Sequence, residues 1–258
     1  MVAGLEPVLL VTVVGIVSFG GLVKGLVGFG YGIAGTALLA LVIDPATAVI
    51  VMILPALAAN LSLVRELEPA EVRSCLRRFW PYVVAAGVGT LLGTAALESI
   101  PRQALAGGLG LLTLGYVASR QSYVTLPSGR LGRLGRPVGA RATVGIGVVS
   151  GVVFGASNIG IQIVAYLDSM ELDRSTFVGV LAMVLVGVTG LRVVAAFALG
   201  LYEGTALSLS LLAVAPGLVG VAIGGVGRRH LSERLLNAGT IALLLVVGVR
   251  LTAGGAGL

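Results

Sequence analysis

The sequence predicts an all-α polytopic membrane protein made of two inverted-topology repeats of five helical segments each. Three observations lead to this prediction. The 258 residues are 57% hydrophobic and 11% charged, whereas a soluble domain carries about 25% charged residues. The apolar runs approach the ~20 residues that a helix needs to cross a bilayer. A glycine-rich interruption occurs twice at corresponding places, which is typical of transporters whose helices are broken at the binding site.

Ten apolar segments follow one another along the chain. They cover residues 7–27, 31–43, 46–64, 80–97, 103–118, 142–156, 159–167, 175–199, 205–226 and 235–251. The second and the seventh are too short to cross a bilayer as straight helices, so each forms either a crossing or a re-entrant hairpin with the segment before it. Asp44 and Pro45 mark the start of the third segment. Pro81 falls in the first turn of the fourth, where proline removes no helical hydrogen bond.

The basic residues predict the orientation in the membrane. Thirteen of the 17 Lys and Arg residues lie in connections that would share one side, namely 65–79, 119–141, Arg174 and 227–234. On the other side lie Arg102 and Arg250. The positive-inside rule therefore places both termini outside and the 119–141 loop in the cytoplasm of a multi-pass plasma-membrane protein. Each half then has an odd number of segments, so the halves are oppositely oriented.

Weak sequence matches between the halves support this division. The first repeat covers 1–118, a basic linker 119–141, and the second repeat 142–258. The matches occur in the same order in both halves: Lys24–Val27 with Ser150–Val153, Asp44–Thr47 with Asp173–Thr176, Gly89 and Gly93 with Gly220 and Gly224, and Gly108 with Gly239. Because glycine is common in this chain, the ordered set carries the argument and no single match does.

The glycine-rich breaks predict the place of a binding site. The first reads K-G-L-V-G-F-G-Y-G (Lys24–Gly32), and the second reads S-G-V-V-F-G-A-S-N-I-G (Ser150–Gly160). Unwound backbone at membrane depth is tolerated only where protein or a water-filled cavity satisfies it. A half-helix that begins after such a break directs free N–H groups toward the cavity and favours anions. The alternative is that these glycines only allow close helix packing.

Two cations lie inside apolar segments, and both are candidate substrate-binding residues. Lys24 precedes the first break, and Arg192 lies within the eighth segment. Intramembrane charges usually face a cavity, and the arginine fork suits an oxyanion. The alternatives are that Lys24 extends to the cytoplasmic surface, and that Arg192 pairs with a backbone carbonyl or with Glu98 or Glu203.

Uncharged residues around the breaks complete the predicted site. The substrate-binding candidates with small, hydroxyl or amide side chains are Gly28, Gly30, Tyr31, Gly32, Ser157, Asn158 and Gln162. Secondary candidates are Thr36, Asn60 and Thr189. Hydroxyl and amide donors suit sulfonate-like oxygens, while interhelical hydrogen bonds are the alternative role for each of these residues.

These residues also resemble the sulfite exporter TauE/SafE family of membrane anion transporters. Gly25–Gly32 and Asp44–Ala48 match the first copy of the family pattern; Ser150–Gly151, Gly155, Asn158 and Ala165–Leu167 match the second. This sequence departs from the pattern at Tyr31, which interrupts the glycine run, and at Ser157–Asn158. The resemblance implies transport of a small sulfur-containing anion, sulfite or an organosulfonate such as sulfoacetate.

The resulting prediction is a secondary transporter that moves this anion by alternating access. An anion channel with the two breaks as a selectivity constriction is the alternative, and a non-transporting membrane scaffold is a third. The expected partners are the small anion, membrane lipid and a coupling ion, H⁺ or Na⁺. The oligomeric state is open, with a homodimer as one alternative.

The other function classes find little support in the sequence. Gly30–Gly35 matches the dinucleotide pattern G-x-G-x-x-G but follows an apolar helix where the pattern requires a strand. His230 and Cys75 are the only residues of their kinds, too few for a typical zinc site. The net charge of +6 is explained by membrane orientation, so nucleic acid is not an expected partner. We expect no enzyme activity, no cofactor and no metal.

Overall fold

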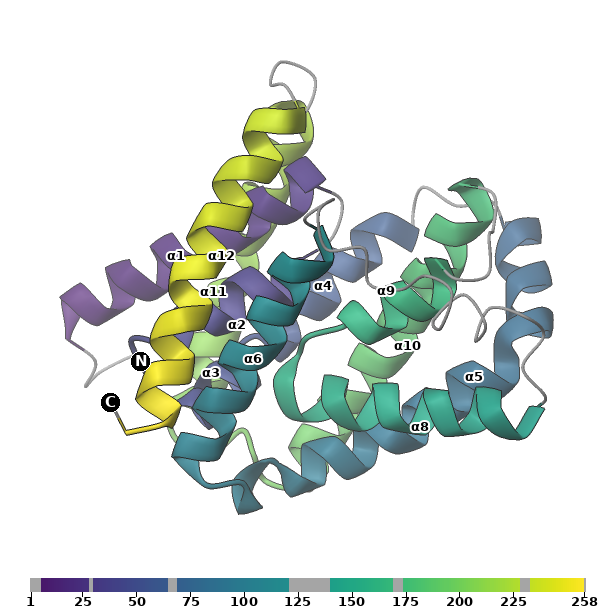
Figure 1. The fold of residues 1–258 in the computed structure, drawn as a ribbon, viewed down its shortest axis with the longest axis horizontal. Coiled ribbons are helices and arrows are strands. Elements are labelled where there is room, and N and C mark those ends of the chain that lie inside the picture. Colours follow the sequence, from purple (N-terminus) through teal and green to yellow (C-terminus); the bar gives the residue numbers. More distant parts are fainter. Residues whose placement is uncertain are drawn as a thin grey trace.

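The computed structural model describes residues 6–27, 30–64, 69–120, 140–168, 174–227 and 233–257. Within these ranges every regular element is a helix, which confirms the predicted all-α class (Figure 1). The elements are α1 (Pro7–Val27), α2 (Tyr31–Leu39), α3 (Pro45–Val51), α4 (Ile53–Val64), α5 (Pro69–Ala96), the 3₁₀ turn η1 (Leu97–Ser99), α6 (Arg102–Arg120), α8 (Ala140–Ser157), α9 (Ile161–Asp168), α10 (Arg174–Ala198), α11 (Ala206–Gly227) and α12 (Glu233–Gly255). Gly28 and most of the predicted linker lie outside the described residues.

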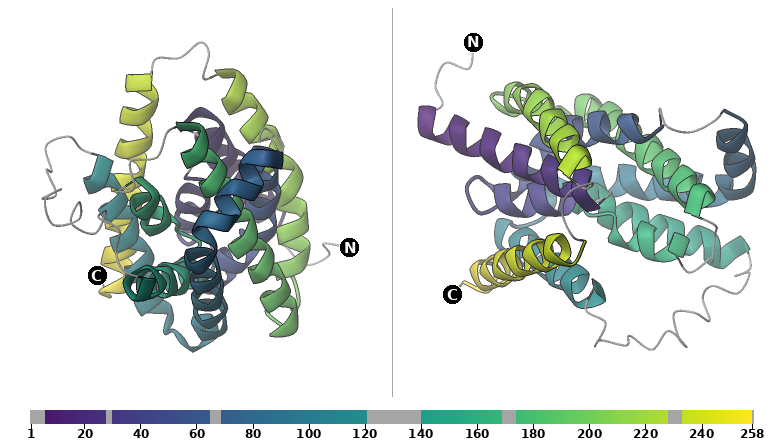
Figure 2. Two further views of the ribbon diagram at one scale, coloured as in Figure 1. Left: turned by 90° about the vertical axis from the view of Figure 1, so that its right-hand side faces the viewer. Right: turned by 90° about the horizontal axis from the view of Figure 1, so that it is seen from above.

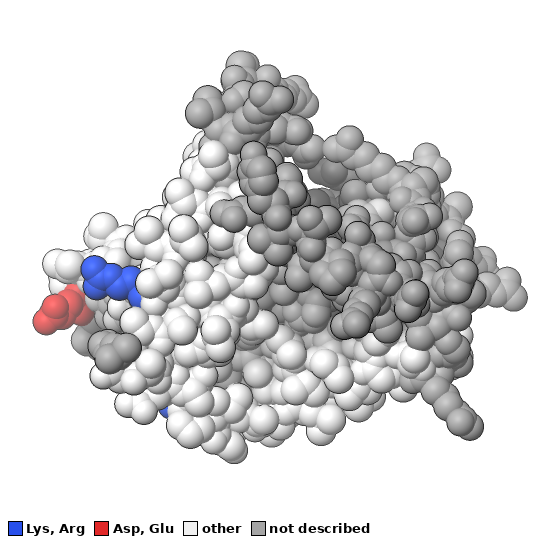
Figure 3. Space-filling model, in the orientation of Figure 1, with Lys and Arg blue, Asp and Glu red and all other residues white. Residues whose placement is uncertain are grey.

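The lengths and compositions of these helices suit a membrane. Five stretches in the described part of the chain are long and apolar enough to cross a bilayer: Pro7–Leu26, Pro45–Ser62, Phe79–Ser99, Ala206–Gly227 and Ala238–Gly255. Two shorter apolar stretches are Ala142–Ser157 and Met183–Ala198. The molecular face in Figure 3 carries charge at few of its described positions. Large apolar side chains such as Val11, Trp80 and Leu211 are more than half exposed, as expected for contact with lipid.

The third predicted segment, 46–64, is divided in two, which the sequence analysis did not predict. Helix α3 ends at Val51 and α4 begins at Ile53. Pro55 has no N–H to donate to the carbonyl of Val51 four residues earlier. The hydroxyl of Ser210 on α11 donates to that carbonyl instead, at 2.8 Å. The proline therefore explains the division, and a side chain of the other half satisfies the freed carbonyl.

The placement of Pro81 in a first helical turn was wrong. Helix α5 begins at Pro69, so Pro81 lies in its interior. The polar, arginine-containing start of α5 has no apolar signal that would have extended the predicted segment toward the N-terminus. An interior proline removes a hydrogen bond and bends a helix, and α5 changes direction along its length in Figure 1.

The helices pair across the two halves of the sequence. Helix α1 packs on α11, α8 packs on α5, and α6 packs on α12; Figure 2 shows α6 and α12 side by side. In the predicted division into repeats, α1 and α8 come first and α5 and α11 hold equivalent places, so the first two contacts are those that a two-fold relation between the repeats would exchange.

Glycines make the first two contacts close, and they do so in the same way. A Cβ on Gly21 would overlap the carbonyl oxygen of Gly217, and a Cβ on Gly151 would overlap that of Ala86. Gly25 lies likewise against Val221, and Gly155 against Thr90. Gly217 and Val221 are 131 positions after Ala86 and Thr90, and Gly151 and Gly155 are 130 positions after Gly21 and Gly25. By their contacts, Gly151 is the counterpart of Gly21. The sequence match instead pairs Lys24 with Ser150, and the two alignments of the halves differ by about one helical turn.

The buried apolar residues form two clusters that meet near the breaks. The larger involves α1–α4, α6, α11 and α12, and it includes Ile159 of the second break. The smaller lies among α5, α8, α9 and α10, and it includes Phe154 of α8. The second break therefore joins the two clusters, and the side chains around it are enclosed by protein.

Candidate functional site

The first break ends in a glycine that the backbone requires. Helix α1 ends at Val27, and Gly30 precedes α2 with φ of 94°. This is the left-handed region, which glycine adopts without a Cβ clash. The first amides of a helix have no intrahelical acceptor. The start of α2 at Tyr31 therefore presents unpaired donors and the positive end of the helix dipole.

The second break is shaped by side chains. Helix α8 ends at Ser157, and Asn158 has φ of 61°, the one left-handed non-glycine residue within the described ranges. Asparagine tolerates this conformation better than most residues. The Ser157 hydroxyl accepts from the Ile159 amide at 3.1 Å and donates to the Val153 carbonyl at 2.5 Å. Gln162 Nε2 donates to the carbonyls of Ser150 and Ile159 at 3.0 and 2.8 Å.

The two breaks lie against each other. A Cβ on Gly32 would overlap the carbonyl oxygen of Asn158. The Asn158 side chain also reaches α2, where its Nδ2 donates to Thr36 Oγ1 at 3.3 Å. Glycine at position 32 therefore allows the start of α2 to approach the second break closely, and the Asn158 amide links the two halves.

A cavity of about 50 Å³ lies between the breaks. Its walls come from both breaks and from the helices beside them: Lys24, Gly30, Tyr31, Gly32, Ile33, Ala56, Asn60, Phe154, Asn158, Gly160, Ile161, Val164 and Leu185. The first residues of both α2 and α9 are among them. The cavity thus combines two helix N-termini with a few polar side chains in an apolar surround.

Lys24 lies at this cavity with its ammonium group buried. Its side chain is 4% exposed, so the alternative that it extends to the protein surface does not describe this structure. Lys24 Nζ donates to Asn60 Oδ1 at 2.5 Å, and Asn60 Nδ2 donates to Thr189 Oγ1 at 3.4 Å. The bond from Asn60 on α4 to Thr189 on α10 is the interhelical hydrogen bond considered as the alternative role for both residues.

Arg192 is completely buried behind the cavity wall. It is not among the lining residues, but two lining residues contact it. Its Nη1 donates to Asn158 Oδ1 at 2.9 Å, and its Cζ lies 5.8 Å from the ring centroid of Phe154. Nε and Nη2 have no hydrogen-bond partner among the described residues. Neither of the carboxylates considered as alternatives, Glu98 and Glu203, pairs with it, and both are exposed.

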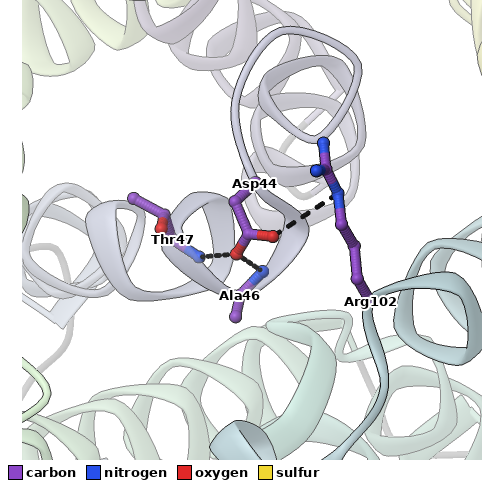
Figure 4. Close-up of polar contacts among 4 residues, drawn as sticks. All are labelled: Asp44, Ala46, Thr47 and Arg102. Atoms are coloured by element: carbon purple, nitrogen blue, oxygen red, sulfur yellow. Dashed lines mark hydrogen bonds and ion pairs between the residues drawn. The ribbon is translucent and has the colours of Figure 1, made fainter.

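The site carries positive charge that no described carboxylate balances. Glu6, Asp44, Glu98 and Glu203 are the acidic residues whose side chains are described, and none lines the cavity. Asp44 instead lies 3.5 Å from Arg102 (Figure 4). A buried cation without a counter-ion is unfavourable. The pair of Lys24 and Arg192 therefore favours an anion as the missing partner.

Most of the predicted site residues come together, but in different roles. At the cavity lie Lys24, Gly30, Tyr31, Gly32, Asn158 and Asn60. Thr36, Thr189 and Arg192 form hydrogen bonds to members of that set. Ser157 and Gln162 bond backbone atoms of the second break and of α8 and do not line the cavity. Gly28 lies outside the described residues.

The sequence analysis did not single out the apolar walls. Phe154, Leu185 and Ala56 line the cavity, and Phe154 also lies over the Arg192 guanidinium within the distance of a cation–π contact. Phe154 precedes Asn158 by four residues, and its carbonyl accepts from the Asn158 amide at 2.8 Å, so the end of α8 holds the two residues close together. That spacing was the available signal. In the described part of the chain there is no cluster of three His, Cys, Asp or Glu residues that could hold a metal.

Comparison with known protein families gives a match over most of the chain. The family described as sulfite exporter TauE/SafE matches residues 13–251, nearly the whole chain and both halves of the site. No curated protein and no solved structure matches the chain. The match covers well over half of the sequence. The chain is a member of the sulfite exporter TauE/SafE family of membrane transporters.

Proposed function

We propose that this protein is a secondary transporter of a small sulfur oxyanion, which binds in the cavity between the two glycine breaks. One observation carries the proposal: Lys24 and Arg192 are both buried at the breaks, and no described carboxylate accompanies them. An anion would supply the missing negative charge. The N-termini of α2 and α9, whose first residues line the cavity, favour the same kind of ligand.

The size of the cavity favours an inorganic anion over an organosulfonate. About 50 Å³ corresponds to a few water molecules, since one water needs roughly 10–15 Å³ on this measure. Sulfite, with four heavy atoms, is of that size, whereas sulfoacetate adds a methylene group and a carboxylate, which are four more heavy atoms. We therefore place sulfite first and sulfoacetate second among the substrates.

Alternating access between inverted halves is the proposed mechanism. The exchanged contacts of α1 with α11 and of α8 with α5 support a two-fold relation. The charge distribution supports termini outside and the 119–141 loop inside. In such transporters the repeats move against each other around a central site.

Flux measurements on proteoliposomes test the transport proposal. We expect saturable uptake of radiolabelled sulfite, inhibition by excess unlabelled sulfite, and counterflow when sulfite is preloaded on the far side. Counterflow requires a carrier, so rapid non-saturating flux without it would favour the channel. Repeating the measurement with imposed H⁺ and Na⁺ gradients identifies the coupling ion.

A ligand screen tests the substrate class separately. Purified protein is heated with sulfite, thiosulfate, sulfate, sulfoacetate, taurine or simple carboxylates, because a ligand that binds the folded state raises the unfolding midpoint. We expect sulfite to give the largest rise and taurine, which carries a positive amine, to give little. Stabilisation by carboxylates and by none of the sulfur anions would overturn the substrate assignment.

A further inference from the structure

The side-chain oxygen of Asn158 binds Arg192 in the place that an anion oxygen could take. The Asn158 carboxamide oxygen accepts from Arg192 Nη1 at 2.9 Å, and it is the acceptor that the described residues provide for this guanidinium. Two further nitrogens, Nε and Nη2, have none. Arginine has five N–H donors and no way to lose its charge in a protein, so most of its binding capacity is unused.

The geometry points to a barrier between Arg192 and the cavity. Asn158 and Phe154 both line the cavity and both contact Arg192, while Arg192 itself does not line it. Lys24, by contrast, lies at the cavity directly. One of the two cations is thus available to an anion in this conformation, and the other is covered.

We propose that Asn158 is an internal substitute for the substrate. It occupies Arg192 while the site is empty, and the anion displaces it during the transport cycle, so that Arg192 becomes a second anion ligand. This inference rests on the proposed function, anion transport, and deepens it by assigning opposite effects to two residues: Arg192 attracts the anion, and Asn158 competes with it.

Displacement would also release a link between the halves. The same carboxamide donates to Thr36 Oγ1 on α2 at 3.3 Å. Asn158 therefore bridges α10 of the second half to α2 of the first. When the anion takes the place of the Asn158 oxygen on Arg192, the side chain must turn and the bond to Thr36 changes with it. Anion binding is in this way coupled to the contact between the breaks.

The test uses Asn158→Gly, because glycine keeps the left-handed backbone and removes the competing side chain. Purified protein is titrated with sulfite by calorimetry, and its unfolding midpoint is measured with and without sulfite. We expect a lower midpoint without ligand and sulfite affinity about tenfold higher, the effect of removing one charge-assisted hydrogen bond. Sulfite flux should fall, since nothing then displaces the anion from Arg192.

Two controls separate this role from a structural one or a direct ligand role. Thr113→Ala removes a buried hydroxyl on α6 that bonds the Leu109 carbonyl and does not line the cavity, so sulfite affinity should stay unchanged. In Asn158→Gly combined with Arg192→Met, the gain in affinity should vanish, since Arg192 is the group being uncovered. Weaker sulfite binding by Asn158→Gly, or a gain that persists without Arg192, would overturn the inference.

Asn158→Asp provides a second measurement that does not depend on the glycine variant. The carboxylate would hold Arg192 permanently, so the unfolding midpoint without ligand should rise and sulfite binding should be lost. A lower midpoint together with unchanged sulfite binding would contradict the inference. If the unsubstituted protein binds no sulfur anion at all, the proposed function fails as well; if it binds sulfite and only these variants disagree, the failure belongs to the role of Asn158.

Discussion

At the scale of single residues, Lys24 is the cation that the cavity exposes directly. The described structure gives its ammonium group one acceptor, Asn60 Oδ1, and two of its three donors remain for a ligand. Its burial at 4% exposure means that little water competes for those donors. The charge of Lys24 should therefore contribute to anion binding more than that of any exposed basic residue.

We expect Lys24→Met to reduce sulfite affinity by roughly ten- to a hundredfold, the range for losing a hydrogen bond to a charged group. Methionine keeps most of the length of the side chain, and it removes a buried charge without a described counter-ion. The unfolding midpoint without ligand should consequently not fall. Calorimetric titration and thermal unfolding of the same preparation measure both effects.

Arg250→Met is the matched control for this prediction. Arg250 is exposed on α12 and does not line the cavity, so its removal should leave sulfite affinity unchanged. Equal losses in the two variants would mean that the net charge of the protein, and not the position of Lys24, attracts the anion.

The polar residues of the site could be predicted from the sequence, but their roles could not. Lys24 and Arg192 stand out because a charge inside an apolar segment is rare, and Asn60 and Thr189 stand out for the same reason among uncharged residues. Whether a side chain lines a cavity or lies one layer behind it depends on packing between helices that are far apart in sequence. That is why Arg192 was expected at the anion and is found covered by Asn158 and Phe154.

At the scale of helices, contacts between glycines and backbone carbonyls of the partner helix set how closely the two halves pack. Gly21 on α1 and Gly151 on α8 each face a backbone carbonyl of the partner helix, whereas a Cβ on Gly15 or Gly145 would meet nothing within 4 Å. Gly15 on α1 and Gly145 on α8 can therefore serve as controls for Gly21 and Gly151 on the same helices.

Gly21→Ala and Gly151→Ala should each destabilise the protein by about 1–3 kcal/mol, the usual range for overpacking a well-packed contact. Gly15→Ala and Gly145→Ala should be close to neutral. Thermal unfolding in detergent measures all four. If only one of the two contact glycines proved sensitive, the α1–α11 and α8–α5 contacts would not be equivalent, and the two-fold relation would lose its support.

The start of α3 is held by a carboxylate that serves two partners. Asp44 Oδ2 accepts from the amides of Ala46 and Thr47 at 3.0 and 3.2 Å, and its other oxygen lies 3.5 Å from Arg102 on α6 (Figure 4). Arg102 is 73% exposed, so its ion pair with Asp44 is screened by solvent and contributes little. The capping bonds should matter more than the ion pair.

We expect Asp44→Ala to lower the free energy of unfolding by about 1 kcal/mol, the typical effect of losing an N-cap. Asp44→Asn keeps a capping oxygen and removes the charge, so its loss should be clearly smaller. Comparison of the two unfolding midpoints at low and high salt separates the contributions. Equal losses for Asn and Ala would assign the stability to the ion pair instead.

Segment positions followed from hydropathy, and helix boundaries within them did not. Apolar runs located nearly every described helix, because length and composition decide what can lie in a bilayer. The division at Met52 depends on Pro55 and on a hydroxyl from α11 that repairs the freed carbonyl. The N-terminal part of α5 is polar and leaves no hydropathy signal. The alignment of the halves by sequence is one helical turn away from their alignment by structure, and only the glycine contacts between helices distant in sequence show this difference.

At the scale of the whole molecule, orientation decides whether the two halves can act as inverted repeats. An odd number of crossings in each half places the middle loop on the side opposite both termini. Parallel halves, with an even number each, would place all three on one side. The positions of three points along the chain are therefore enough to distinguish the two arrangements.

Single cysteines at these three points test the arrangement, because Cys75 is the only natural cysteine and Cys75→Ser provides a background without thiols. In intact cells a membrane-impermeant maleimide should label Glu6→Cys and Gly257→Cys, and it should label Arg130→Cys only after the membrane is permeabilised. Labelling of all three in intact cells would mean that the halves are parallel. Labelling of Arg130→Cys alone would keep them inverted but reverse the orientation that the arginine-rich loops predict. Labelling of only one terminus would give one half an even number of crossings, and the breaks could then not approach the cavity from opposite faces.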